Sequence, residues 1–331
     1  MNAGRAGPDV LTLDTGAEVE RIAAWMREVV PGTLKRRGVV VALSGGIDSS
    51  CCAALAVRAF GPARVFALQL PERDSATDTQ DRGRQLIEHL GVDSATLDIG
   101  PALEAVGAYR DRDAAMARAL PGYGPGWRSK IVVAGGLSGG INHFRLVARA
   151  PDGAMHDVRL GAREYLAIVA ATNHKQRLRK AIEYHHADRL HFAVVGTPNR
   201  LEYDQGFFVK NGDGSADVKP IAHLYKSQVY GMARHLGLPE RVCAAIPTTD
   251  TYSLSQGQDE FYFALPYREM DLALYALNHG FPASALASAL GIEETKAKAI
   301  YDDIANKRRT TRYMHLPPVL VADVPEPRAQ A

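Results

Sequence analysis

The chain has 331 residues, of which 46% are hydrophobic and 23% are charged, and its formal net charge is +2. These values are typical of a soluble protein with one large domain or two, and the small charge gives no reason to expect a nucleic-acid or membrane partner. Residues 1–13 lack the apolar stretch of a signal peptide, so we expect a cytoplasmic protein. The three cysteines form no Cys-x-x-Cys pair, which argues against a metal cluster or a disulfide framework.

The amino-terminal third of the chain alternates helices and strands. In chain order we expect a helix at 17–30, a strand at Val39–Leu43, a helix at Ser49–Phe60, a strand at Val65–Leu70, a polar turn at Pro71–Thr79, a helix ending at Leu90 and a strand at Ala95–Ile99. This alternation predicts a doubly wound, Rossmann-like α/β fold whose parallel sheet is flanked by helices on both faces. Ligands of such sheets bind at the carboxyl ends of the strands.

Residues 107–164 interrupt the alternation and are predicted to be a long insertion. They are rich in glycine and proline, and they include a predicted hairpin of Phe144–Arg149 and His156–Leu160 that turns at Pro151-Asp152-Gly153. The elements expected after the insertion are a helix at Tyr165–Ala187, a strand at Leu190–Val195, and helices at Tyr225–Leu236, Pro266–Asn278, Ala283–Leu290 and Glu293–Arg308. We expect a single domain over 17–320, with extended tails at 1–16 and 321–331.

The loop Ser44-Gly45-Gly46-Ile47-Asp48-Ser49 lies between the first strand and the helix that follows. Unpaired N–H groups and the positive end of a helix meet there, which favours phosphate binding. Glycines let the backbone approach a phosphate closely, and an aspartate can hold a divalent cation on the phosphate oxygens. The Gly-Lys-Ser/Thr ending of a Walker A loop is missing, so this is a different kind of phosphate loop.

Residues 134–142 repeat part of this pattern, with Asn142 in the place of Asp48 and His143 in the place of Ser49. A second phosphate site is one interpretation of the repeat. A mobile flap or a hairpin corner is the simpler one, because glycine-rich turns recur by chance.

The loop resembles the pyrophosphate loop of the ATP pyrophosphatases, which are adenine nucleotide alpha hydrolase-like proteins, and four later segments resemble their NAD synthetase family in particular. In order, these segments are the helix 173–179, the run from Val195 to Asp217, the Leu-x-Lys-x-Gln of 224–228 and the basic end at 307–309 with Pro317-Pro318. Five motifs in the family's order are much more specific than any one of them.

The resemblance implies an ATP-dependent ligase that forms an acyl adenylate and transfers ammonia to it, with Mg²⁺ screening the phosphates. It implies catalytic roles for Asp48, Lys210 and Asp217, and Mg²⁺ ligation by Asp48 and Glu202. The residues it assigns to ATP are Ala42, Leu43, Ser44, Gly45, Gly46, Ile47, Asp48, Ser49, Thr197, Lys226 and Thr248. Those it assigns to the acid substrate are Arg177, Lys210, Asp217, Asn306 and Lys307.

The chain departs from the family pattern on the acid side. Asn306 stands where the family has a histidine, Thr310–Leu316 is inserted before Pro317, and the segment after Thr248 is replaced. Nicotinic acid adenine dinucleotide is therefore the first expected substrate, and another carboxylic acid is the alternative. Sulfur transfer and a non-catalytic binding role rank lower, because no cysteine is suitably placed and both proposed metal ligands, Asp48 and Glu202, are present.

We expect the nitrogen to come from free ammonia, from an amine, or from ammonia that a partner protein delivers, because the loop begins at residue 44 and the sequence shows no glutaminase domain ahead of it. The resemblance also implies a homodimer, in which the acid substrate sits between the subunits. The insertion at 107–164 enters just before the helix that carries Arg177, so we expect it to cover or shape the acid pocket. A tolerated surface insertion is the competing interpretation.

Overall fold

The computed structural model describes residues 7–134, 143–245, 252–254, 257, 262–263 and 265–325. Its centre is a four-stranded sheet in the order β3-β2-β1-β7, and every pair of neighbouring strands is parallel. The strands are β1 (Val39–Ala42), β2 (Val65–Gln69), β3 (Asp93–Thr96) and β7 (Ala193–Val195). The predicted parallel α/β sheet is therefore confirmed, with β1 next to β7 although some 150 residues separate them in sequence.

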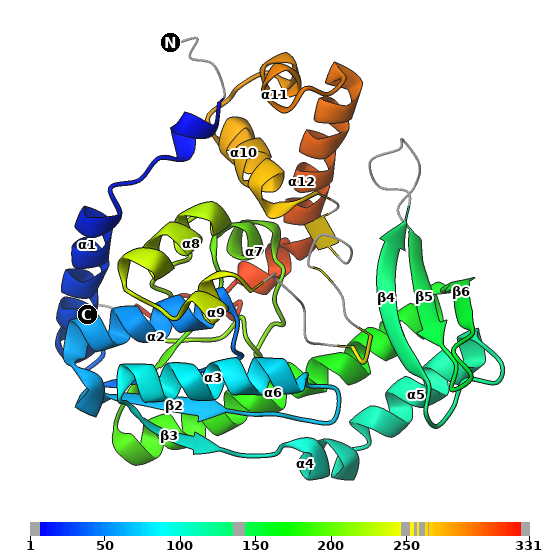
Figure 1. Ribbon diagram of the computed structural model, residues 1–331, viewed down its shortest axis with the longest axis horizontal. Helices are drawn as coiled ribbons and strands as arrows, with labels where there is room; N and C mark the ends of the chain where they lie inside the picture. The colour runs from blue at the N-terminus through cyan, green and yellow to red at the C-terminus, as the bar shows by residue number, and fades with distance from the viewer. Residues whose placement is uncertain are drawn as a thin grey trace.

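Alternate residues of the strands face the two layers of helices, as the two-residue period of a strand requires. Val39 and Val41 pack with α1 (Thr15–Glu28), α2 (Ile47–Phe60) and α8 (Lys226–His235). Val40 faces the other way, toward α4 (Gly100–Ala105) and α6 (Ala162–Leu190). Helices thus cover both faces, with α3 (Thr77–Leu90) beside β2, and Figure 1 shows α2 and α3 on one side of the strands and α6 on the other.

The first helix after the sheet's central strand begins and ends at glycines. Gly46 is the N-cap of α2, and Gly61 is its C-cap at φ 76°, followed at once by Pro62 and a 3-10 turn, η3 (Pro62–Arg64). The predicted end at Gly61-Pro62 is confirmed, whereas the helix starts two residues before the expected Ser49.

The region predicted as an insertion contains more regular structure than expected. A helix, α5 (Ala108–Ala119), precedes an antiparallel sheet of β4 (Arg128–Ala134), β5 (His143–Arg149) and β6 (Met155–Arg159). The predicted hairpin is β5–β6, turned at residues 150–154. The repeat of the glycine loop lies, from residue 135 to 142, outside the described residues. Figure 1 shows this sheet standing beside the carboxyl-terminal helices, over one end of α6.

The carboxyl-terminal helices form a cluster with its own core. They are α10 (Tyr267–Asn278), α11 (Ala283–Leu290) and α12 (Glu294–His315), and they pack against α7 (Arg200–Gln205), while α9 (Glu240–Cys243) follows α8. We expected the last helix to end at Arg308, but it continues to His315. Thr310 and Thr311 donate their hydroxyls to carbonyls one turn back, and no proline occurs before Pro317 to stop the helix.

The expected extended tail at 1–16 is wrong over its described part. A 3-10 helix, η1 (Pro8–Leu11), forms there, and Val10 and Leu11 pack against the carboxyl-terminal helices. The side chain of Asp14 then caps α1 by accepting a hydrogen bond from the Ala17 N–H, and a π-helical turn, η2 (Val29–Thr33), ends this helix. Residues 316–325 carry no helix or strand and are exposed. No described helix has the length and apolar character needed to cross a membrane.

Candidate active site

The phosphate loop lies at the carboxyl end of β1 and is held by its own serines. Ser49 Oγ donates to the Gly46 carbonyl at 3.1 Å and accepts from the Ser44 N–H at 3.3 Å, and Ser50 Oγ donates to the same carbonyl at 2.7 Å. The loop wraps the amino terminus of a 14-residue helix, whose first N–H groups are free to face an anion.

Position 45 of this loop accepts only glycine, because of its backbone conformation and a close neighbouring carbonyl. Its φ is +73°, and a β-carbon built there would lie 2.1 Å from the carbonyl oxygen of Thr79. Arg82 Nε donates to the Gly45 carbonyl at 3.0 Å, so the start of α3 packs directly on the loop. The missing side chain allows two backbones to approach more closely than any alanine could allow.

Asn199 brings the two carboxylates predicted as metal ligands together. It is 1% exposed, and its Nδ2 donates to Asp48 Oδ1 at 3.2 Å while its N–H donates to Glu202 Oε2 at 3.1 Å. Its Oδ1 accepts from the N–H groups of Leu201 and Glu202, which completes a capping box at the start of α7. Asp48 after β1 and Glu202 after β7 therefore share one partner at the point where the strand order reverses, where ligands of such sheets bind.

Lys226 lies between the same two charges. Its ammonium forms an ion pair with Asp48, and its side chain is 2% exposed. Burial by itself lowers the pKa of Lys226, but the charges of Asp48 and Glu202 outweigh burial and raise the pKa above its usual value. The lysine therefore stays charged, and it neutralises the carboxylates.

The donor set fits a magnesium ion carried by a nucleotide. Mg²⁺ usually takes one or two carboxylates from the protein and completes its shell with phosphate oxygens and water. Asp48 and Glu202 supply two carboxylates beside the phosphate loop, and among the residues that the structure describes no group of three His, Cys, Asp or Glu side chains could hold a metal alone.

Asp271 of α10 fixes the start of the helix that carries Lys226. Its carboxylate accepts from the Lys226 N–H at 3.0 Å and the Ser227 N–H at 2.7 Å, although they belong to a different helix. Burial raises the pKa of Asp271 to about 6, and these hydrogen bonds oppose the shift only in part.

The raised pKa of Asp271 predicts a loss of stability between about pH 4 and pH 6. Over that range the unfolded chain releases the proton and the folded chain keeps it, so rising pH favours unfolding, by roughly 3 kcal/mol for a shift of about two units. Urea unfolding of wild type and Asp271→Asn at pH 4 and pH 7 measures this. The wild type should lose roughly 3 kcal/mol more than the variant, and an equal loss in both would contradict the assignment.

A cavity of about 760 Å³ opens at this end of the sheet, a size suited to a nucleotide. Of the residues assigned to ATP, the cavity is lined by Ala42, Leu43, Ser44, Gly46, Ile47, Asp48, Ser49, Thr197 and Lys226, together with Glu202. Gly45 lies within the same loop with its backbone against Thr79. Thr248 lies outside the described residues.

The residues assigned to the acid substrate fall into two groups. Asn306 and Lys307 of α12 line the cavity. Burial lowers the pKa of Lys307, and its ion pair with Asp303 at 2.6 Å opposes that change.

Arg177, Lys210 and Asp217 form the other group and are not among the cavity-lining residues. Arg177 Nε donates to the Lys210 carbonyl at 3.3 Å, and Lys210 Nζ donates to the Tyr313 carbonyl at 2.8 Å, at the end of α12. Asp217 accepts from the Val194 N–H at 2.7 Å and so holds its own segment beside β7.

Several residues in or beside the cavity were not identified from the sequence: Lys175 and Lys180 line the cavity, and Asn199 contacts the lining residues Asp48 and Glu202. Asn199 could have been, because an asparagine three residues before a glutamate is the pattern of a capping box. Lys175 and Lys180 could not, because residues 174–180 are generally polar and resemble a solvated helix face, yet both lysines are buried in the structure. One partner of Lys175 is Glu72, 103 residues away in sequence, whereas Lys180 pairs with Glu183 one turn further along α6.

The family model of NAD synthase matches residues 18–119 and 154–313. The chain is 56% identical over 319 residues to the NH(3)-dependent NAD(+) synthetase of Rhizobium meliloti, a match that covers 96% of this chain and 95% of that protein. It is 54% identical over 318 residues to the protein of the same name from Mesorhizobium japonicum, which covers 96% of this chain and 100% of the relative.

Solved structures show the same fold. An NMN synthetase from Francisella tularensis has a TM-score of 0.64 at 23% identity, over 93% of this chain and 100% of that one. The NAD+ synthetase from Burkholderia pseudomallei has a TM-score of 0.57 at 25% identity, over 95% and 93% of the two chains. The segment that the family model leaves unmatched, 120–153, is shorter than the insertion expected at 107–164.

Proposed function

The chain belongs to the NAD synthase family, and from this premise we propose that it joins ammonia to nicotinic acid adenine dinucleotide and forms NAD, AMP and pyrophosphate from ATP. The observation that carries the proposal is the meeting of the phosphate loop with Asp48, Glu202 and Lys226 around Asn199. Such a cluster of charges is what ATP cleavage at the α-phosphate needs.

The reaction takes place in two steps. A free carboxylate has no leaving group, so a carboxylate oxygen of the substrate first attacks the α-phosphorus of ATP, and pyrophosphate leaves. The nitrogen of ammonia then attacks the carbonyl carbon of this acyl adenylate, loses a proton, and displaces AMP. Mg²⁺, held by Asp48 and Glu202, would neutralise charge on the phosphates when bound.

The chain's own residues orient the nucleotide and offset its charge. The N–H groups at the start of α2 and the hydroxyl of Ser44 face the space where the pyrophosphate leaves. Lys226 supplies a permanent positive charge there, and Asn199 keeps the two carboxylates a fixed distance apart. No Walker lysine directs cleavage to the γ-phosphate.

The alternative substrate, another carboxylic acid, is not favoured. Relatives that are 56% and 54% identical over nearly the whole chain are named as NAD synthetases. The NMN synthetase shares the fold at 23% identity, which says nothing of the acid that this chain uses.

The acid site is proposed to extend beyond the cavity and to be completed by a second subunit of a homodimer. Asn306 and Lys307 would contact the acid inside the cavity. Arg177 is exposed on α6, and with Lys210 and Asp217 it would face the part of the substrate that lies between subunits. Lys210 and Asp217 keep the catalytic roles that the resemblance implies, and ammonia would come free from solution or from an external donor.

A product assay with the purified protein tests the function. With ATP, Mg²⁺, ammonium and nicotinic acid adenine dinucleotide, NAD, AMP and pyrophosphate should form in equal amounts, and nicotinic acid mononucleotide should react far more slowly. Glutamine should not replace ammonium, because the cysteines of the chain, Cys51, Cys52 and Cys243, are all buried and burial raises the pKa of each thiol. Formation of ADP, or a preference for the mononucleotide, would contradict the proposal.

A further inference from the structure

The unmatched residues 120–153 carry β4 and β5, which build a small core together with α5, β6 and α6. The buried members of this core include Met116, Ile131, Leu146 and Ile168. Tyr252 also belongs to it, although it follows β4 by more than a hundred residues, and it is 5% exposed. A residue of the α9–α10 connection is therefore part of the interior of the β4–β6 sheet.

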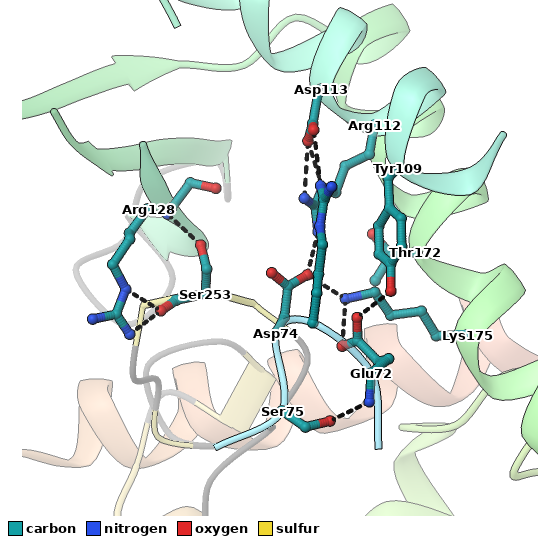
Figure 2. Close-up of polar contacts among 12 residues, drawn as sticks. Glu72, Asp74, Ser75, Tyr109, Arg112, Asp113, Arg128, Thr172, Lys175 and Ser253 are labelled. Atoms are coloured by element: carbon teal, nitrogen blue, oxygen red, sulfur yellow. Dashed lines mark hydrogen bonds and ion pairs between the residues drawn. The ribbon is translucent and has the colours of Figure 1, made fainter. Parts of the chain in front are cut away.

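The base of this sheet is tied to the rest of the protein by buried charges (Figure 2). Lys175 Nζ of α6 lies 3.0 Å from Glu72 Oε1 and 2.6 Å from Asp74 Oδ2, and Arg112 Nη1 of α5 lies 2.5 Å from the same Asp74 oxygen. The hydroxyl of Tyr109 donates to Glu72 Oε2 at 2.7 Å. All four charged side chains are at most 7% exposed.

These contacts fix three elements relative to one another. Burial by itself raises the pKa of Asp74, but the charges of Lys175 and Arg112 lower it below its usual value, so the carboxylate stays ionised. The turn that carries Glu72 and Asp74 leads into α3, which packs on the phosphate loop. The β4–β6 sheet thus stands on a rigid base that is continuous with the ATP site.

The β4 edge of the sheet holds residues 252–254. β4 pairs with β5 on one side only, and on its other side the Ser129 N–H donates to Ser253 Oγ at 2.9 Å while the Leu254 N–H donates to the Ser129 carbonyl at 3.1 Å. Arg128 Nε donates to the Ser253 carbonyl at 2.8 Å, and Figure 2 shows the arginine reaching this carbonyl. The segment lies along the edge as an added strand would.

The held segment forms part of the cavity wall at the end far from the phosphate loop. Tyr252 lines the cavity with Val133, Phe144 and Tyr165, and the rings of Phe144 and Tyr165 stack with centroids 3.8 Å apart. Tyr165 precedes Arg179, another lining residue, which donates to the Leu70 carbonyl just after β2, by 14 positions on one helix, a rise of about 21 Å. A wall of aromatic rings at this distance suits a planar ring of the acid substrate.

We propose that the β4–β6 sheet positions this wall, and that Arg128 and Ser253 are positioning residues that set the affinity for the dinucleotide acid by holding Tyr252 in the cavity. The inference rests on the proposed function. Neither residue lines the cavity, so both act through the segment that they hold. The KM for the acid depends on them, while the KM for ATP and kcat depend on the opposite end of the cavity.

The test compares Arg128→Gln, Ser253→Ala and the double variant with wild type in the NAD-forming assay and in hydrogen–deuterium exchange of the peptide that contains 252–254. The KM for the acid should rise about tenfold in the double variant, with the KM for ATP and kcat changed less than twofold, and the peptide should exchange faster. Arg128→Lys retains a charged donor, so its KM for the acid should lie closer to that of wild type than the KM of Arg128→Gln does.

Arg145→Gln is the matched control, because Arg145 lies on β5 of the same sheet and bonds Asp157 on β6 rather than the segment. It should leave both KM values and the exchange unchanged. Unchanged exchange in the double variant, unchanged KM for the acid, or an equal rise in both KM values would each overturn the proposal. Absence of NAD formation by wild type would instead refute the proposed function, and the exchange data would still judge whether Arg128 and Ser253 hold the segment.

Discussion

Replacing Asp48 with asparagine should lower the rate of NAD formation at least about a hundredfold, the usual cost of losing one electrostatic contact to a developing charge. The variant keeps an oxygen that can accept from Asn199 Nδ2, so the loss would reflect charge rather than shape. Initial rates of pyrophosphate release at saturating ATP measure it. Near-wild-type turnover in a folded variant would remove Asp48 from the proposed metal site.

The same substitution should also destabilise the protein, because it leaves the buried ammonium of Lys226 without its ion-pair partner. Removing one member of such a pair typically costs about 3 kcal/mol or more. Asp48→Asn combined with Lys226→Met should recover most of the stability in urea unfolding and none of the activity. Glu202→Gln is the companion variant, since glutamine can still accept from the Asn199 N–H, and it should lose activity with a smaller loss of stability.

The phosphate loop could be predicted from the sequence because its determinants are local. A strand, two glycines and a helix start are contiguous in the chain, and each has a short-range signal. The parallel sheet followed from the alternation of strands and helices for the same reason. The structure reproduces the loop, its helix and the strands within a few positions, although the pairing of β1 with β7 joins residues far apart in sequence.

The buried charges could not be predicted, because burial depends on residues far apart in sequence. Lys175 meets Glu72 and Asp74 only after α6 crosses the end of β2, and nothing near residue 175 indicates this. The sequence likewise gave no reason to place the segment after Thr248 against β4. The helix α12 continues to His315, beyond the predicted end at Arg308, and the resemblance gives no guide there because residues 310–316 depart from the family pattern.

The binding site for the acid substrate remains a prediction, because the residues assigned to it divide between the cavity and an exposed surface. Asn306 and Lys307 line the cavity, but Arg177 does not. The resemblance alone assigned Arg177 to the acid, and the cavity of the single chain neither includes this residue nor gives it another role.

The substitution Gly45→Ala should be the most damaging single-methyl change in the phosphate loop. A positive φ costs alanine roughly 1–2 kcal/mol, and its β-carbon would lie 2.1 Å from the Thr79 carbonyl oxygen, so the loop and the start of α3 must separate. That separation would also strain the bond from Arg82 to the Gly45 carbonyl. We expect a loss of at least about 2 kcal/mol in the free energy of unfolding and little NAD formation.

Gly46→Ala is the control, because its φ is −88° and the nearest atom to its β-carbon is Ser44 Oγ at 3.3 Å. It should keep wild-type stability in urea unfolding, even where the added methyl group weakens ATP binding. Equal stability of the two variants would show that contact with Thr79 is not what requires glycine at position 45.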